Sequence, residues 1–123
     1  MSRPAIPNDQ RLIVALDLPS GNEARELVEA LGDSVSFYKV GLELFTGADG
    51  FAVVDWLSTY GKQVFVDLKF FDVPATVARA VKQLRGRNIT FATVHGNDAI
   101  MQAAAEVSGD VGILAVTVLT SLD

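Results

Sequence analysis

A short run of charged residues at the end of an apolar segment holds the groups best suited to chemistry. Residues 62–70, KQVFVDLKF, are rich in β-branched and aromatic residues, which favours a strand. Side chains two apart in a strand share a face, so Asp67 and Lys69 are expected side by side, with Asp72 shortly beyond. Desolvation cancels much of the Coulomb gain of a buried ion pair, so such a pair is rarely kept for stability. The spacing therefore predicts a catalytic acid and amine; the alternative is an ion pair at the rim of a sheet, with Asp72 starting the next helix.

Composition and charge narrow the class of protein. The chain has 123 residues, half of them hydrophobic, which predicts one domain over residues 1–123 with its own core. It has no cysteine and one histidine, so disulfides and thiolate metal sites are excluded and a zinc site is not expected. A net charge of -5 without a basic run argues against nucleic acid and membranes as partners. Residues 1–10 lack the apolar segment of a signal peptide, so we expect a cytoplasmic protein.

Strand-like and helix-like segments alternate along the chain. Capping-box spacing from Ser20 to Glu23 predicts the start of one helix, and Pro74 suits the first position of another. The expected helices are 20–32, 48–60, 74–86 and 99–107. The expected strands are 11–18, 35–44, 62–70, 89–96 and 111–120. This order predicts an α/β fold of parallel strands joined by right-handed crossovers.

A barrel and an open doubly wound sheet both have this alternation. No glycine-rich loop of the Rossmann or Walker kind follows any expected strand, which argues against nucleotide binding of that kind. A polar residue instead recurs near the carboxyl end of each strand. These residues are Asp17, Lys39, Asp67 with Lys69, His95, and Thr117 or Thr120. Because the active sites of (β/α)8 barrels are built at that face from several strands, the pattern favours a TIM barrel.

Five segments resemble, in order and spacing, the orotidine 5'-phosphate decarboxylase family: VALDLPS, YKVG, DLKFFDVPATV, TVHG and VTVLTS. The resemblance runs from about Arg11 onward. It implies loss of CO2, without any cofactor, from C6 of orotidine 5'-phosphate, which gives uridine 5'-phosphate in pyrimidine biosynthesis. Lys69 would stabilise the developing carbanion and then supply its proton, while Asp67 would lie near the departing carboxylate and hold Lys69 in place.

The resemblance also implies roles for residues outside this pair. Asp72 and Thr76 would reach into the site of the neighbouring subunit, so a homodimer with sites at its interface is expected. Asp17 would accept hydrogen bonds from ribose hydroxyls, and Lys39 would join the ribose and carboxylate network. Thr120 would contact the pyrimidine. By pattern alone Asp17 also suits a turn, Lys39 a strand end and Thr120 a strand, so these alternatives stay open.

Three further positions are given no role in the proposed site. Family members often have His and Asn where this chain has Phe71 and Ala75. We interpret both differences as variation in packing, because the charged triad is kept. His95 is expected to be a structural histidine at the end of a strand.

The length of the chain limits what it is expected to do. A closed barrel of this type has eight strands and typically about 250 residues, whereas this chain stops after the fifth expected strand. We therefore expect the first five βα units, with the Lys/Asp half of the site and without the loops that bind the substrate phosphate. Such a fragment would be weakly active or inactive alone.

Two alternatives to the decarboxylase are kept. One is a magnesium-dependent phosphosugar decarboxylase of the same superfamily, which shares the D-x-K-x-x-D triad. The V-P-A-T segment after Asp72 favours orotidine 5'-phosphate decarboxylase over this alternative. The other is a non-catalytic half-barrel that self-associates through its open sheet edges.

Overall fold

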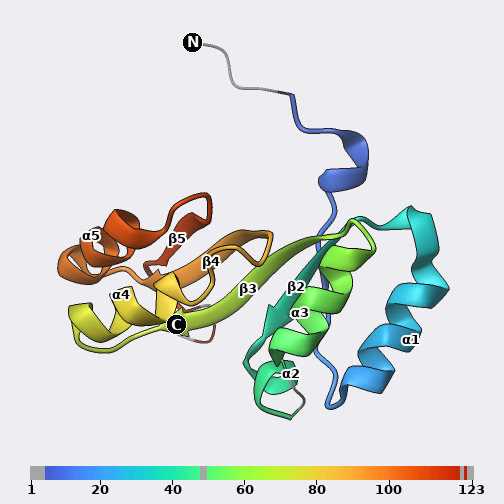
Figure 1. Ribbon diagram of the computed structural model, residues 1–123, viewed down its shortest axis with the longest axis horizontal. Helices are drawn as coiled ribbons and strands as arrows, with labels where there is room; N and C mark the ends of the chain where they lie inside the picture. The colour runs from blue at the N-terminus through green and yellow to red at the C-terminus, as the bar shows by residue number, and fades with distance from the viewer. Residues whose placement is uncertain (1–4, 48–49, 120, 122–123) are drawn as a thin grey trace. The chain divides into compact units, whose positions relative to one another are not determined.

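The computed structural model describes residues 5–47, 50–119 and 121, and in it strands and helices alternate (Figure 1). The strands are β1 (Val14–Ala15), β2 (Phe37–Gly41), β3 (Gln63–Phe70), β4 (Ile89–His95) and β5 (Gly112–Val116). The helices are α1 (Gly21–Leu31), α2 (Leu42–Gly47), α3 (Gly50–Thr59), α4 (Pro74–Lys82) and α5 (Asp98–Val107), with short 3-10 helices η1 (Asn8–Gln10) and η2 (Gly32–Ser34).

The strands form one parallel sheet in the order β1-β2-β3-β4-β5. Each strand is therefore hydrogen-bonded to the strand that follows it in the sequence. A doubly wound sheet reverses its order at a switch point, and no reversal occurs here. The order confirms the TIM-barrel prediction, and it separates the barrel from the open sheet that the strand pattern alone left open.

Several element boundaries were predicted correctly. The Ser20 side chain accepts a hydrogen bond from the backbone N–H of Glu23 at 3.2 Å and so caps α1, as the capping-box spacing indicated. Pro74 occupies the first turn of α4, where its missing N–H costs no helical hydrogen bond. Gly61, two residues after the end of α3, has a φ of 71°, a left-handed conformation that glycine adopts without strain.

Other boundaries differ from the prediction. β1 covers Val14–Ala15 instead of 11–18, because only these two residues lie in register with β2, opposite Tyr38 and Lys39. β2 ends at Gly41 instead of residue 44, because the helix α2 begins directly at Leu42. The prediction had no helix there, since a short apolar run fits a strand and a buried helix equally well. β5 covers Gly112–Val116 instead of 111–120.

The chain divides into two compact units, Met1–Val64 and Phe65–Asp123. The second unit has a core of buried residues from α4, β4 and α5, which are Val77, Val81, Val94, Ile100 and Ala104. Phe70, Met101, Val107 and Ile113 pack against this core. Burial of these aliphatic side chains is the main force that holds α4 and α5 on β4. The single domain expected for residues 1–123 stays a prediction.

The first unit buries an unusual polar group, the hydroxyl of Tyr38 on β2. Tyr38 is fully buried, and no hydrogen-bond partner for its hydroxyl exists among the residues that the structure describes. Burial raises the pKa of Tyr38 above its ordinary value of 10.0, because the phenolate would lose its hydration. The hydroxyl is therefore a local cost to stability.

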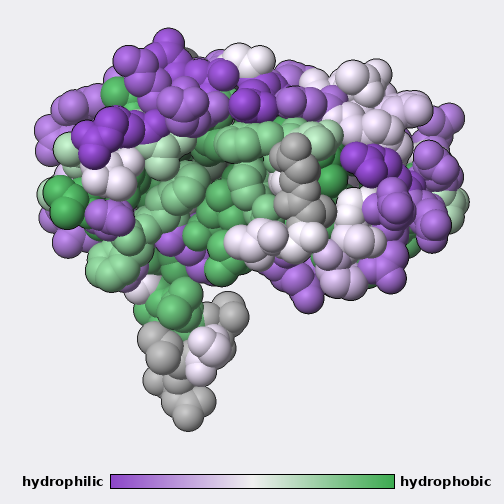
Figure 2. All heavy atoms as spheres, turned by 60° about the horizontal axis from the view of Figure 1, so that its bottom comes forward, coloured by the Kyte–Doolittle hydropathy of each residue, from purple (hydrophilic) through white to green (hydrophobic). Residues whose placement is uncertain are grey.

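Apolar side chains also reach the surface, and many of them gather across the middle of the face seen in Figure 2. The more exposed of them include Leu42 and Tyr60 in the first unit and Phe71, Val73 and Val118 in the second. Among the described residues, no helix is long and apolar enough to cross a membrane.

Candidate active site

Asp67 and Lys69 form an ion pair near the carboxyl end of β3. The Lys69 Nζ donates a hydrogen bond to Asp67 Oδ2 at 2.9 Å. The Asp67 side chain is only 11% exposed, whereas that of Lys69 is 48% exposed. The carboxylate is thus fixed in the protein while the amine reaches solvent. The side-by-side placement predicted from the two-residue spacing is confirmed; the catalytic role of the pair stays a prediction.

Thr93 on β4 joins this pair into a closed ring of hydrogen bonds. Its hydroxyl donates to Asp67 Oδ1 at 2.7 Å and accepts from the backbone N–H of Lys69 at 3.0 Å. Thr93 is 6% exposed, so its polar oxygen depends on these two partners. The ring runs from the Lys69 amine through Asp67 and Thr93 back to the Lys69 backbone.

Sequence analysis did not identify Thr93. In the TVHG segment, the position near the end of the strand points to His95 as the polar residue, and not to Thr93. Thr93 lies two residues before His95 and therefore on the same face of β4. A hydroxyl on a buried strand needs a hydrogen-bond partner, and this requirement was the signal available in the sequence.

The backbone of Lys69 has an uncommon conformation. Its φ is 50°, in the left-handed region that residues with a Cβ rarely adopt. Such a conformation costs on the order of 1–3 kcal/mol and persists only where surrounding contacts hold it, often at functional sites. Here the hydrogen bond from the Lys69 N–H to Thr93 is a contact of that kind.

Asp72 follows β3 and Thr76 lies in the first turn of α4, and both form hydrogen bonds to residues close to them in the sequence. Asp72 is exposed, and its Oδ1 accepts from the backbone N–H of Val73 at 2.6 Å. Thr76 Oγ1 accepts from Arg79 Nη2 at 3.1 Å. Within the described part of the chain, Asp72 does not join the ion pair of Lys69. Their reach into a partner's site stays a prediction.

The other predicted substrate residues lie elsewhere in the chain. Asp17 is exposed two residues after β1, and Lys39 is half-buried on β2, opposite Ala15. Both belong to the unit Met1–Val64. Lys39 lies in the middle of β2 and not near its carboxyl end, where the sequence pattern placed it. Thr120 lies outside the described residues, and the alternative, Thr117, is exposed just after β5.

His95, which sequence analysis left without a role, contacts Phe71. Their ring centroids are 4.3 Å apart. Gly96 follows His95 because a Cβ there would lie 2.8 Å from the carbonyl oxygen of Val116, closer than side chains tolerate. The glycine of TVHG therefore serves the close approach of β5 to the end of β4.

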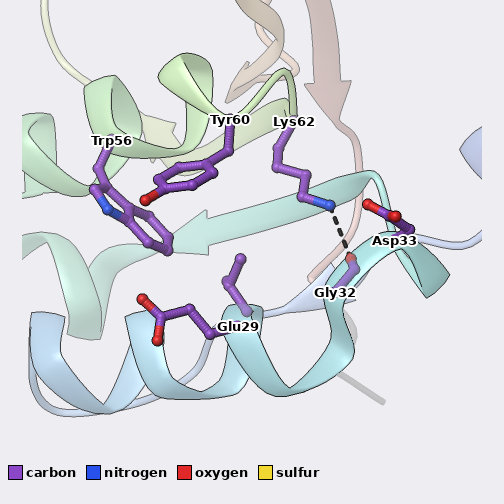
Figure 3. Close-up of a pocket in the computed structure, with 7 residues that line it drawn as sticks. Glu29, Gly32, Asp33, Trp56, Tyr60 and Lys62 are labelled. Atoms are coloured by element: carbon purple, nitrogen blue, oxygen red, sulfur yellow. Dashed lines mark hydrogen bonds between the residues drawn. The ribbon is translucent and has the colours of Figure 1, made fainter.

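A pocket of about 250 Å³ lies in the first unit, and none of the predicted site residues lines it (Figure 3). Its walls come from α1, η2, α3 and Lys62, with Glu29, Trp56 and Tyr60 turned toward one another. The Lys62 Nζ donates to the carbonyl oxygens of Gly32 at 2.9 Å and Val35 at 2.8 Å. Lys62 thus holds the end of α1, and the pocket belongs to the packing of α1 against α3.

The described residues contain no group of three or more His, Cys, Asp or Glu side chains placed to hold a metal ion. The chemistry that the site itself offers is that of an ammonium beside a fixed carboxylate. Such an ammonium can stabilise a developing negative charge and donate a proton to it.

The chain is similar in sequence to known proteins. Residues 10–123 match the orotidine 5'-phosphate decarboxylase / HUMPS family. The chain is 68% identical over 123 residues to the orotidine 5'-phosphate decarboxylase of Methylococcus capsulatus, covering 100% of this chain and 51% of that protein. It is 52% identical over 126 residues to that of Stenotrophomonas maltophilia, covering 99% of this chain and 52% of that protein.

A solved structure shows the same arrangement of elements. The crystal structure of orotidine 5'-phosphate decarboxylase from Lactobacillus acidophilus matches with a TM-score of 0.83 at 37% identity, over 93% of this chain and 55% of that chain. The chain therefore belongs to the orotidine 5'-phosphate decarboxylase / HUMPS family. It spans about half the length of the relatives that it matches.

Proposed function

We propose that this chain carries the Lys/Asp part of the active site of an orotidine 5'-phosphate decarboxylase, an enzyme of pyrimidine biosynthesis. The observation that carries the proposal is the Asp67–Lys69 pair at the end of β3, held by Thr93. Family membership gives this geometry a substrate, because the relatives are named for the decarboxylation of orotidine 5'-phosphate.

The proposed reaction uses no cofactor. The bond from C6 of the pyrimidine to its carboxylate breaks, CO2 leaves, and the electron pair of that bond stays on C6. The ammonium of Lys69 stabilises this negative charge and then transfers one proton to C6, which gives uridine 5'-phosphate. Lys69 suits both tasks because its side chain is partly exposed and can reach a substrate. Its Nζ is also kept in place by Asp67 Oδ2, which lies 2.9 Å away.

Asp67 contributes through its position and charge. Its side chain is 11% exposed and is fixed through both oxygens, so it cannot turn away from a substrate placed at Lys69. We propose that Asp67 lies near the departing carboxylate. Repulsion between the two carboxylates would then raise the energy of the bound substrate and be relieved as CO2 leaves.

The remaining residues complete the proposal. Asp17, Lys39 and Thr120 would bind the ribose, the carboxylate network and the pyrimidine, as the family resemblance implies. Asp72 and Thr76 would act at the site of a second subunit, so the active form would be a homodimer. The relatives are about twice as long, and the phosphate contacts are expected from the half of them that this chain does not match. Location in the cytoplasm stays a prediction.

The test is turnover of orotidine 5'-phosphate by the protein as its gene encodes it, followed by the loss of orotate absorbance in the ultraviolet. We expect turnover that survives EDTA and that is lost in Lys69→Ala. Loss of activity in EDTA, with recovery on adding magnesium, would favour the phosphosugar decarboxylase. No turnover of either substrate class by a folded protein of known oligomeric state would favour the non-catalytic, self-associating half-barrel.

A further inference from the structure

We propose that Thr93 is a positioning residue that sets the geometry of the Asp67–Lys69 pair, because it holds both the carboxylate of Asp67 and the backbone of Lys69. The inference rests on the proposed function and adds to it a residue on the neighbouring strand. Thr93 touches no reacting atom in this arrangement. Its hydroxyl contacts Asp67 Oδ1 at 2.7 Å and the Lys69 backbone N–H at 3.0 Å.

The first contact fixes the orientation of the carboxylate. The Thr93 hydroxyl has a single proton, and Asp67 Oδ1 accepts it. This leaves Asp67 Oδ2 for the Lys69 amine. A carboxylate held at one oxygen cannot rotate about its last bond without losing that hydrogen bond, so the direction of the other oxygen is also set. Hydrogen bonds to charged groups are among the stronger ones, and little water reaches Thr93, which is 6% exposed.

The second contact fixes the backbone from which the lysine extends. The φ of 50° at Lys69 is costly for a residue with a Cβ, so it requires a specific partner. The oxygen of Thr93 accepts the Lys69 N–H and supplies that partner. The lysine side chain is 48% exposed, so packing does little to place its amine. Its placement depends on the backbone at one end and on Asp67 at the other.

Only a short hydroxyl side chain serves both contacts. Valine has nearly the shape of threonine but can neither donate to Asp67 nor accept from the Lys69 N–H. Serine keeps both abilities and loses one methyl group. The pair Thr93→Val and Thr93→Ser therefore separates the hydroxyl from the packing of the side chain.

The activity arm uses the protein as its gene encodes it, with orotidine 5'-phosphate as substrate. We expect Thr93→Val to lower kcat about 10- to 100-fold with KM changed less than about threefold, because the lost hydrogen bonds orient the reacting pair and do not bind substrate. Thr93→Ser should restore kcat to within about threefold of the parent protein. Thr90→Val, the same substitution on the same strand three residues earlier, is the matched control and should leave kcat unchanged. Equal losses in Thr93→Val and Thr93→Ser, or a loss confined to KM, would overturn the proposal.

A second arm needs no turnover. Amide hydrogen exchange measured by NMR should be at least about tenfold faster at Lys69 in Thr93→Val than in Thr93→Ser, while amides in the middle of β3 and β4 keep their rates. Unchanged exchange at Lys69 would show that Thr93 does not hold that backbone. If the parent protein does not turn over orotidine 5'-phosphate, the proposed function fails, whereas this arm still decides whether Thr93 holds the pair.

Discussion

The rings of Phe71 and His95 lie with their centroids 4.3 Å apart and their planes inclined by 45°. Phe71 lies two residues beyond Lys69, and His95 lies two residues beyond Thr93. The contact therefore links the ends of the same two strands that the Asp67–Thr93 hydrogen bond links deeper in the sheet. The contact also gives an aromatic packing partner to His95, the one histidine of the chain. The sequence did not indicate a role for this residue.

A first prediction follows from this contact. Phe71→Ala should lower the free energy of unfolding by about 1 kcal/mol, since it removes an aromatic pair whose rings are both partly in solvent. Phe71→His should cost less, because an imidazole can stack on His95 in the same place. Urea unfolding of both variants measures the difference. Val73→Ala, which shortens an exposed apolar side chain in the same loop, is the control. Equal stability of Phe71→Ala and Phe71→His would show that the ring contact contributes nothing.

The second prediction concerns the reacting pair. Lys69→Ala should lower decarboxylation about 10³-fold or more, because it removes the ammonium that pairs with Asp67 at 2.9 Å and that we propose as the proton donor. Asp67→Asn should also be severe, since it removes the charge that holds the amine. Circular dichroism should show an unchanged fold in both. Lys82→Ala, at an exposed lysine of α4, should keep full activity. Near-normal turnover by Lys69→Ala would rule out its role as proton donor.

The third prediction tests whether two subunits share each site. Inactive Lys69→Ala subunits mixed with inactive Asp72→Asn subunits should recover activity, because one of the two sites in each heterodimer would then be intact. Lys69→Ala mixed with Asp67→Asn should recover none, since those two residues pair within one chain at 2.9 Å. Heterodimers shown to form without regained activity would place Asp72 in the site of its own subunit.

The fourth prediction uses the buried hydroxyl of Tyr38. Tyr38→Phe removes a polar group that has no partner among the described residues, so at neutral pH the variant should be more stable by about 1 kcal/mol. Burial raises the pKa of Tyr38 in the folded protein above the value of the unfolded chain, so the folded state holds the proton more tightly. The parent protein should therefore lose stability, relative to Tyr38→Phe, as the pH rises above about 10.

Urea unfolding at neutral and alkaline pH measures this difference. Tyr60→Phe, at an exposed tyrosine, is the matched control and should show no such change. A parent protein that matches Tyr38→Phe at every pH would show that the hydroxyl is hydrated or bonded in solution.

The sequence predicted the parts of this site that follow from local pattern. The alternation of β3 places Asp67 and Lys69 on one face, and the order of elements predicts the parallel sheet. Thr93 was not predicted, because its role depends on which residue of β4 lies beside Asp67. The left-handed φ of Lys69 was not predicted either, since lysine has no preference for it and a contact from another strand holds it.

Element lengths were predicted less well for a related reason. Residues 11–18 have the composition of a long strand. The length of a strand is set by how many of its residues pair with a neighbouring strand, and only Val14 and Ala15 pair with β2. Residues 42–47 contain two leucines and a phenylalanine that suit a strand or a helix, and contacts within the folded chain decide in favour of α2.

The left-handed backbone of Lys69 places the activity that we propose and the stability of the fold in conflict at one residue. Glycine adopts that conformation without cost, so Lys69→Gly would remove the backbone strain together with the amine. Selection for thermal resistance alone would favour glycine at this position, and selection for turnover would keep lysine. Stabilising changes in this chain are therefore best sought in places such as Tyr38, far in the sequence from the strained residue that we propose as the proton donor.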